Sequence, residues 1–146
     1  MSDPVLGITV DCVDARVMTG FWSLALDYEE APPPQGWATW SEFLTDQGVP
    51  ENEWGDGGAI RPRSGTGPTI SFLKVPEPKV AKNRVHLDLK VSGGRHVAPE
   101  LRTERIRAKA AELVQAGATP LHEDEVNGHL DHLVMADPEG NEFCIV

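Results

Sequence analysis

One order of elements occurs twice in this chain of 146 residues. A strand, a helix and three further strands are predicted over residues 6–75, and the same series is predicted over residues 84–146. Each half would form a sheet with one apolar face covered by its helix, while the other face carries polar side chains. Two such sheets can curve round a shared cavity. The repeat therefore predicts an α+β fold, in which two modules form a curved mixed sheet around a central cleft.

The first copy opens with a strand and an amphipathic helix. Residues alternate between apolar and polar from Leu6 to Val10, which is the period of a strand. Asp14 is placed as the N-cap of a helix over Ala15–Leu26, because apolar residues recur there at spacings of three and four. Further strands are predicted at Tyr28–Ala31, Gly57–Arg61 and Thr69–Val75.

The second copy has the clearest strand pattern, at Val85–Val91, followed by a helix at Pro99–Ala116. Asp137-Pro138-Glu139-Gly140 predicts a hairpin turn, because proline presets φ and glycine accepts positive φ. The other expectations are a strand at Ala118–His122, an acidic turn at Glu123–Glu125, and hairpin strands at Leu133–Ala136 and Glu142–Val146.

The length is that of one domain, so residues 1–146 are predicted to be a single domain. Module one is expected at about residues 5–76 and module two at residues 84–146. A linker at residues 77–83 would join them.

A long segment of the first copy is rich in tryptophan. It begins at Pro32-Pro33-Pro34, which ends the preceding strand because proline cannot donate to a ladder. Within it, Thr39 or Ser41 could cap a short helix that ends near Gly48. The segment contains Trp37, Trp40 and Trp54, and an aromatic loop of this length is typical of a cover over a ligand pocket. The alternative is that these side chains only fasten the loop to the domain.

Charge and composition exclude several classes of function. There are 13 Lys and Arg against 23 Asp and Glu, a formal net charge of −10, and no basic cluster suited to nucleic-acid phosphates. No run of about 18 apolar residues occurs and the N-terminus lacks a signal-peptide pattern, so we expect no membrane span and a cytoplasmic location. Cys12 and Cys144 each lie in an apolar run, which favours free buried thiols.

The first strand of each copy carries a polar face. Thr9 lies on this face in the first copy, and His86, Asp88 and Lys90 lie on it in the second. Inward polar side chains need partners or water, which favours a ligand cavity over a packed core. Because histidine suits proton transfer near neutral pH, His86 with Asp88 is the candidate catalytic pair. Thr9 and Lys90 join the three tryptophans as candidate ligand contacts.

Three stretches resemble the vicinal oxygen chelate superfamily, which contains glyoxalases, bleomycin-resistance proteins and extradiol dioxygenases. The final DPEGNEFCIV is similar to the closing hairpin of this superfamily, and VPEPKVAKNRVHLDLKV at Val75–Val91 is similar to the central stretch of its bacterial glyoxalase-like branch. Gly20-Phe21-Trp22 resembles the helix of the first repeat. The resemblance covers nearly the whole chain except residues 32–66. It implies paired βαβββ modules, a small-molecule site in the cleft between them, and a homodimer.

The resemblance also implies where a metal would bind. Members that hold a metal usually take histidine from the first strands and glutamate from the last. The corresponding residues are Gly7, which cannot ligate, His86, which matches, and Cys144, which stands where glutamate is usual. Glu142 lies on the same face as Cys144, so His86 and Glu142 are the candidate metal ligands and Cys144 a candidate ligand contact. The implied cofactor is one divalent metal: Zn, Ni, Mn or Fe.

Two classes of function stay open. The first is a protein that binds an aromatic or cationic small molecule without a complete metal site. The second is an enzyme, either a metal-dependent lyase, isomerase or dioxygenase using His86 and Glu142, or a metal-free enzyme in which His86 and Asp88 transfer protons. Gly7 counts against the metal enzyme. A weaker pattern is His129 with His132, which could chelate, although a surface pair is the simpler interpretation.

Overall fold

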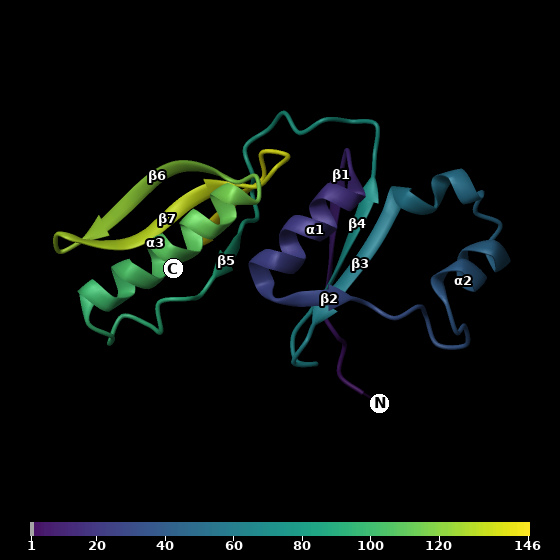
Figure 1. The fold of residues 1–146 in the computed structure, drawn as a ribbon, viewed down its shortest axis with the longest axis horizontal. Coiled ribbons are helices and arrows are strands. Elements are labelled where there is room, and N and C mark those ends of the chain that lie inside the picture. Colours follow the sequence, from purple (N-terminus) through teal and green to yellow (C-terminus); the bar gives the residue numbers. More distant parts are fainter. Residues whose placement is uncertain (1) are drawn as a thin grey trace. The chain divides into compact units, whose positions relative to one another are not determined.

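The structure is a computed structural model that describes residues 2–146. It contains two compact units, of which the first ends at Pro78 and the second runs from Lys79 to Val146. Each unit is a βαβββ module with its own four-stranded mixed sheet (Figure 1), so the predicted α+β class is confirmed. Two predictions, the cleft shared by the modules and their union in a single domain, depend on how the two units are placed relative to each other. Both stay predictions. Among residues 2–146, no helix combines the length and apolar character needed to cross a membrane.

The first unit has the strand order β1-β4-β3-β2. Its strands are β1 (Gly7–Cys12), β2 (Tyr28–Glu30), β3 (Gly57–Pro62) and β4 (Thr69–Lys74). β1 is parallel to β4, and the other neighbours are antiparallel. α1 (Ala15–Leu26) packs on β2, β3 and β4 and buries Met18 and Phe21. The predicted N-cap is confirmed, because Asp14 Oδ1 accepts the N–H of Arg16 at 3.0 Å.

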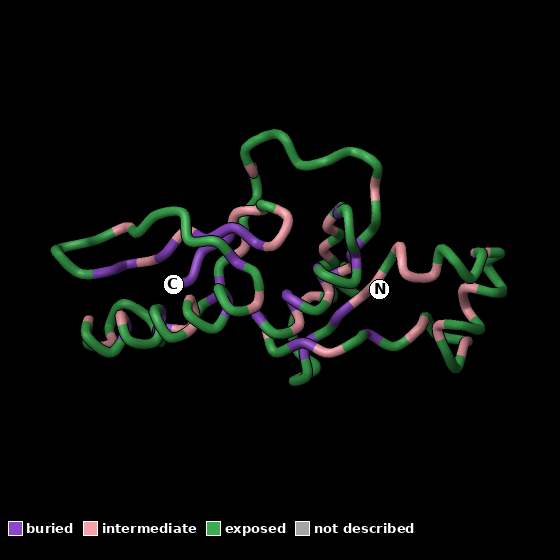
Figure 2. Tube along the Cα trace, turned by 45° about the horizontal axis from the view of Figure 1, so that its top comes forward, coloured by how far each residue is buried: buried purple, intermediate pink, exposed green. Residues whose placement is uncertain are grey.

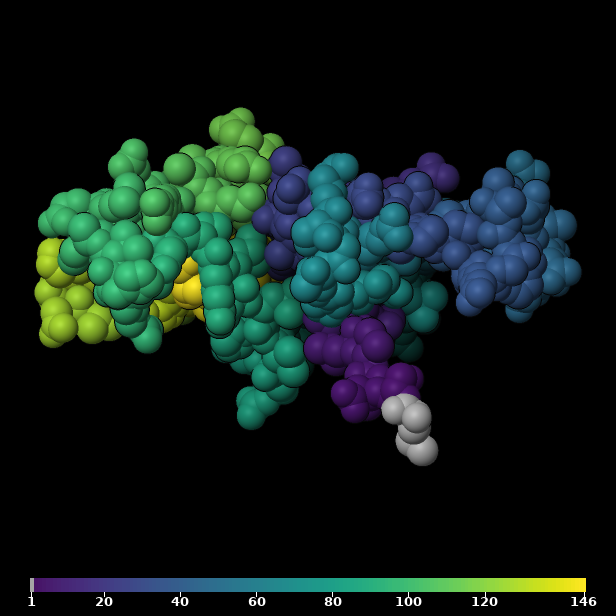
Figure 3. All heavy atoms as spheres, turned by 90° about the horizontal axis from the view of Figure 1, so that it is seen from below, coloured from purple at the N-terminus to yellow at the C-terminus, as the bar shows by residue number. Residues whose placement is uncertain are grey.

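The tryptophan-rich segment between β2 and β3 folds into two short helices. These are α2 (Trp40–Asp46) and the 3-10 helix η1 (Glu51–Asp56). Thr39 caps α2, because its Oγ1 accepts the N–H of Glu42 at 3.1 Å. Figure 3 shows this segment, in blue, as a lobe that projects from the rest of the first unit. Residues 40–56 are called the α2–η1 segment below.

The second unit has the strand order β5-β8-β7-β6. Its strands are β5 (Leu87–Leu89), β6 (Thr119–Val126), β7 (His129–Ala136) and β8 (Glu142–Ile145). β5 is parallel to β8, while β7 is antiparallel to both of its neighbours. α3 (Pro99–Gln115) buries Ile106 and Leu113. Figure 2 shows that β7 and β8 are largely buried, whereas the outer strand β6 is exposed along most of its length.

Two predictions for the second unit need correction. β5 has only three residues, because only Leu87–Leu89 pair with β8. Glu123–Glu125 lie inside β6 and not in a turn. An exposed edge strand tolerates charged side chains, which also protect it from pairing with other chains. The turn lies at Asn127-Gly128, where both residues have positive φ, as a two-residue hairpin requires.

A β-bulge interrupts the pairing of β6 with β7. The register shifts between Asp124 and Glu125, so that Asp131 has no partner on β6. A bulge can re-aim a side chain, and the Asp131 carboxylate is 6% exposed. It accepts two hydrogen bonds from Arg95, each of 2.9 Å, and lies 3.7 Å from Nη2 of Arg102 on α3. This ion group joins β7 to α3 and to the loop before it.

The predicted turn between β7 and β8 is confirmed, and it is built around a buried carboxylate. Asp137 is 3% exposed. Its Oδ1 accepts the backbone N–H of Glu139 at 2.9 Å and that of Asn141 at 3.0 Å. Gly140 has φ 87°, which a glycine adopts without strain. The side chain of Asp137 thus fixes the hairpin that ends the chain.

We expect Asp137→Ala to lower the free energy of unfolding by about 2 kcal/mol, because it leaves buried N–H groups without an acceptor. Urea unfolding followed by circular dichroism measures the change. Asp137→Asn keeps one acceptor oxygen and should lose less. Unchanged stability of the alanine variant would contradict this role for the turn.

Candidate functional site

Each sheet has one face without a helix of its own module, called the open face below. In the first unit, the register places Thr9 of β1, Ser71 of β4 and Ala59 of β3 side by side. Their neighbours Ile8, Ile70 and Ile60 point to the opposite side, which α1 covers. At these three positions the open face carries small side chains, and Leu73, two residues after Ser71, adds a larger apolar one.

A pocket of about 470 Å³ lies between the α2–η1 segment and this open face. Trp40, Leu44 and Trp54 line it from the segment, and Ala59 and Ser71 line it from the sheet. The small residues of the sheet leave room beneath the large apolar side chains of the segment. The predicted cover over a ligand pocket thus has a physical counterpart within the first unit.

Hydrogen bonds fix both indole rings of the pocket. Nε1 of Trp40 donates to the carbonyl of Ala31 at 2.8 Å, and Nε1 of Trp54 donates to the carbonyl of Val49 at 3.0 Å. Since both N–H groups are engaged by backbone, the rings offer their apolar surfaces and not a donor. An incoming molecule would meet them through stacking or edge contacts.

Three carboxylates also line the pocket: Glu30, Glu53 and Asp56. Asp56 Oδ1 lies 3.9 Å from Nζ of Lys74, a weak exposed ion pair. Within residues 2–146, no basic group lies within ion-pair distance of Glu30 or Glu53. The pocket therefore combines aromatic surface with negative charge.

Two of the predicted ligand contacts in the first unit lie outside this lining. Trp37 packs edge-on against Phe43, with ring centroids 5.0 Å apart, and Phe43 contacts Trp40 in turn at 5.9 Å. Trp37 thus fastens the segment, as the alternative interpretation had it, while Trp40 and Trp54 line the pocket. Thr9 lies beside Ser71 on the open face but does not line the pocket.

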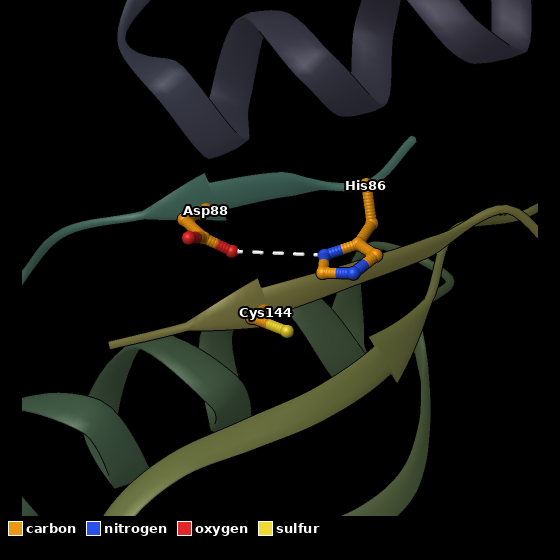
Figure 4. Close-up of side chains that lie close together, drawn as sticks. All are labelled: His86, Asp88 and Cys144. Atoms are coloured by element: carbon orange, nitrogen blue, oxygen red, sulfur yellow. Dashed lines mark ion pairs between the residues drawn. The ribbon is translucent and has the colours of Figure 1, made fainter. Parts of the chain in front are cut away.

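In the second unit, the parallel pairing of β5 with β8 brings three donor side chains together. The register places Asp88 directly beside Cys144. His86 lies two residues before Asp88, and its Nδ1 is 3.9 Å from Asp88 Oδ1 (Figure 4). One donor atom from each of His86, Asp88 and Cys144 lies within 4.8 Å of the other two. An imidazole, a carboxylate and a thiol at this spacing could hold a metal ion.

The electrostatics of this donor group keep its thiol protonated. Cys144 is free and 7% exposed. Burial, followed by the charge of Asp88, raises the pKa of the Cys144 thiol. A metal ion bound there would have to displace the thiol proton.

Glu142, the metal ligand expected from the sequence, is engaged elsewhere. Its carboxylate forms an ion pair with Lys82, whose hydrogen bond is the main cause that lowers the pKa of Glu142. Its backbone N–H donates to Asn83 Oδ1 at 3.1 Å. The structure thus groups His86 with Asp88 and Cys144, and Glu142 as a ligand stays a prediction. Lys90 lies in the lining of a cavity of about 590 Å³, which Asp88 and Arg95 also line.

A second group of polar side chains, which no sequence pattern indicated, lies on the open face of the second unit. Asp124 Oδ2 lies 3.2 Å from Nε2 of His122 and 3.0 Å from Nε2 of His132. Asn127-Gly128 is the signal that pairs β6 with β7. The bulge then sets which residues face each other. In the register of the turn Asp124 would face Asp131, and the one-residue shift places it opposite His132 instead. His132 is thus engaged by Asp124 and not by His129.

The family model described as glyoxalase-like domain matches residues 7–146. No curated protein matches the chain. A fosfomycin resistance protein, FosX, from Listeria monocytogenes, in complex with Mn(II) and 1S,2S-dihydroxypropylphosphonic acid, has a similar fold. It is 12% identical, with a TM-score of 0.62 over 99% of this chain and 90% of that one.

Two further solved structures are similar. A glyoxalase/bleomycin resistance protein/dioxygenase family enzyme from Burkholderia phytofirmans PsJN is 16% identical, with a TM-score of 0.58 over 94% of this chain and 93% of that one. A possible glyoxalase from Bacillus cereus is 9% identical, with a TM-score of 0.57 over 99% of both chains. At these identities the likeness shows a common fold.

The Asp131 ion group predicts how stability depends on pH. The hydrogen bond from Arg95, followed by that from His132, lowers the pKa of Asp131 well below its usual range. A depressed pKa stabilises the fold above the unfolded-state pKa of about 3.9, and this contribution is lost as the pH falls below it. Asp131→Asn should therefore lower the free energy of unfolding by about 3 kcal/mol at pH 6, because the buried Arg102 loses its ionic partner and keeps only long hydrogen bonds to the carbonyls of Arg95 and Leu130.

The difference in unfolding free energy between the wild type and Asp131→Asn should narrow by about 1 kcal/mol between pH 6 and pH 3. Urea unfolding of both proteins at the two pH values tests this, since all other acidic groups are common to them. A difference that stays constant would show that Asp131 is not the charged partner described above.

Proposed function

The chain belongs to the glyoxalase-like domain family of the vicinal oxygen chelate superfamily, and from this premise we propose that it binds a small organic molecule. The observation that carries the proposal is the pocket of about 470 Å³ beneath the α2–η1 segment. Its volume lies in the range of sites for small ligands. Trp40 and Trp54 supply aromatic surface at one wall, and the open face of the sheet supplies the other.

The lining favours an aromatic or cationic ligand. The indole rings are held by their N–H groups, so that their remaining surface is available for stacking on a flat molecule. A positive charge on that molecule would interact with the rings and with the carboxylates of Glu30 and Glu53. The net charge of −10 attracts cations to the chain from a distance and repels anions.

Calorimetric titration with naphthyl-trimethylammonium, compared with neutral naphthyl-methanol and anionic naphthalene sulfonate, tests this preference. We expect the cation to bind most tightly and Trp54→Leu to weaken its binding about tenfold, because the variant removes an aromatic wall. Trp37→Phe is the matched control, since it changes a tryptophan outside the pocket lining and keeps an aromatic ring against Phe43. Equal affinities for the three probes, or equal effects of the two variants, would refute the proposed ligand preference.

A second candidate function is a metal-dependent lyase, isomerase or dioxygenase, and a specific observation supports it. His86, Asp88 and Cys144 present three donor atoms within 4.8 Å of one another. The mixture of nitrogen, oxygen and sulfur suits zinc, nickel or iron(II) better than manganese. A metal held there would supply Lewis-acid chemistry to a bound substrate. In an enzyme without a metal, His86 and Asp88 would serve as the proton-transfer pair expected from the sequence.

Zinc added to chelator-treated protein should raise the midpoint of thermal unfolding, and His86→Ala and Cys144→Ser should each remove part of that gain. Glu142→Gln decides between the two ligand sets. An unchanged response would favour Asp88 and Cys144 as the partners of His86, whereas a loss would favour Glu142. The metal proposal fails if His86→Ala and Cys144→Ser respond to zinc as the wild type does.

The oligomeric state, the location and the type of partner expected from the sequence also stay proposals. A homodimer is implied by the superfamily resemblance, and a cytoplasmic location without a nucleic-acid partner is the expectation from composition. Sedimentation of the purified protein would test the first of these.

A further inference from the structure

A cavity in the second unit has hydrogen-bond donors that the proposed function does not use. It has a volume of about 590 Å³ and lies beside the loop between β5 and α3, with Lys90, Ser92 and Arg102 in its lining. We propose that this cavity, called the β5–α3 cavity below, binds a small molecule through a carboxylate or phosphate group. Its lining residues all belong to the second unit, so the proposal does not depend on the ligand pocket of the first unit.

Arg102 is a buried guanidinium group whose contacts are long. Its side chain is 10% exposed. Nη1 lies 3.5 Å from the carbonyl oxygen of Arg95, and Nη2 lies 3.4 Å from that of Leu130 and 3.7 Å from Oδ1 of Asp131. Ordinary N–H···O bonds measure about 2.7–3.2 Å, and those between a guanidinium group and an anion lie at the short end of this range. A guanidinium group has five N–H groups, so Arg102 keeps donor capacity for an anion that enters the cavity.

Ser92 adds a hydroxyl group that its surroundings hold in place. The residue is 8% exposed, its N–H donates to the backbone oxygen of Val146 at 3.1 Å, and its carbonyl accepts Nη1 of Arg105 at 2.9 Å. Its Oγ accepts the N–H of Gly94 at 3.3 Å, and within residues 2–146 the hydroxyl donates no hydrogen bond of its own. A Cβ at Gly93, which has φ 92°, would lie 2.8 Å from Nη1 of Arg105 and would push it from Ser92. The glycine therefore helps to fix a hydroxyl donor beside the cavity.

Lys90 supplies a second positive charge to the lining. It is exposed, and in the part of the chain that the structure describes no carboxylate lies within ion-pair distance of its ammonium group. The buried carboxylate of the lining is already engaged, because Asp131 accepts two hydrogen bonds from Arg95 and lies 2.9 Å from Nδ1 of His132. The other carboxylate, Asp88, belongs to the donor group of the β5–β8 pair. The unused capacity of Lys90, like that of the buried arginine and serine, is thus that of a donor, which favours an anionic ligand.

The negative charge of the whole chain does not prevent such binding. The formal net charge is −10, but at physiological ionic strength exposed charges more than about 8 Å apart are largely screened. Contacts with a bound anion are direct, and a charge-assisted hydrogen bond is about twice as strong as a neutral one. The net charge therefore slows the arrival of an anion more than it weakens the contacts of a bound one.

Phenyl phosphate, benzoate and benzylammonium test the proposal, because they attach different charged groups to one kind of ring. Each is titrated into the full chain while the backbone amide signals are followed by NMR. We expect the anions, but not the cation, to shift the signals of Gly93 and Gly94, which line the cavity. Lys90→Ala should weaken anion binding about fivefold, because one charged contact is lost. Lys79→Ala is the matched control, since it removes the same charge from an exposed position of the same unit outside the lining.

A second variant separates a built site from general attraction by charge. Ser92→Ala leaves the charge unchanged and should weaken anion binding about threefold, because the hydroxyl donor is lost. Shifts at Gly93 and Gly94 with either anion, together with a larger effect of Lys90→Ala than of Lys79→Ala, support the site, and the anion that binds more tightly identifies the group it takes. The proposal is overturned if neither anion shifts these signals, if the cation shifts them as strongly, or if the two lysine variants have equal effects. Shifts of the cation in the first unit concern the other pocket and leave this result unaffected.

Discussion

Each sheet of this chain has one helix of its own module to cover it, and this constraint decides where function can lie. The first and last strands of each module are parallel neighbours, and parallel neighbours require a crossover. In the first unit, α1 follows β1 and buries Phe21 and Met18 on one face. In the second unit, α3 follows β5 and buries Ile106 and Leu113 against the sheet. The ligand pocket of the first unit and the donor group of His86 lie on the opposite, open faces, whereas the β5–α3 cavity lies beside the helix.

The two open faces have the same architecture but different chemistry. In the first unit the sheet contributes small residues such as Ala59 and Ser71, and an added segment supplies the aromatic wall. In the second unit no such segment is inserted, and the sheet itself carries imidazoles, carboxylates and a thiol. The fold repeats because the pattern of apolar residues repeats, whereas the polar residues between them are free to differ.

Local signals predicted most of the elements. Asp14 and Thr39 mark helix starts through side-chain caps, and Asp137 marks the closing turn through its buried hydrogen bonds. Non-local pairing could not be predicted in the same way. The pocket needs β3 beside β4, and the imidazole group needs a one-residue bulge that leaves Asp131 unpaired. A shift of one residue moves a side chain to the other face, and no local pattern near Asp124 specifies that shift.

The β-bulge at Asp131 has two effects, since it turns one carboxylate towards both a buried arginine and a histidine. Its carboxylate turns inward to Arg102 of α3, which anchors β7 to the helix. The same carboxylate reaches Nδ1 of His132, so the anchor also fixes an imidazole on the open face. In the first unit, the superfamily resemblance places Gly7, which has no side chain to ligate, at a position where a metal ligand is expected. The first unit thus offers aromatic surface beside carboxylates, whereas the second groups an imidazole, a carboxylate and a thiol on its sheet.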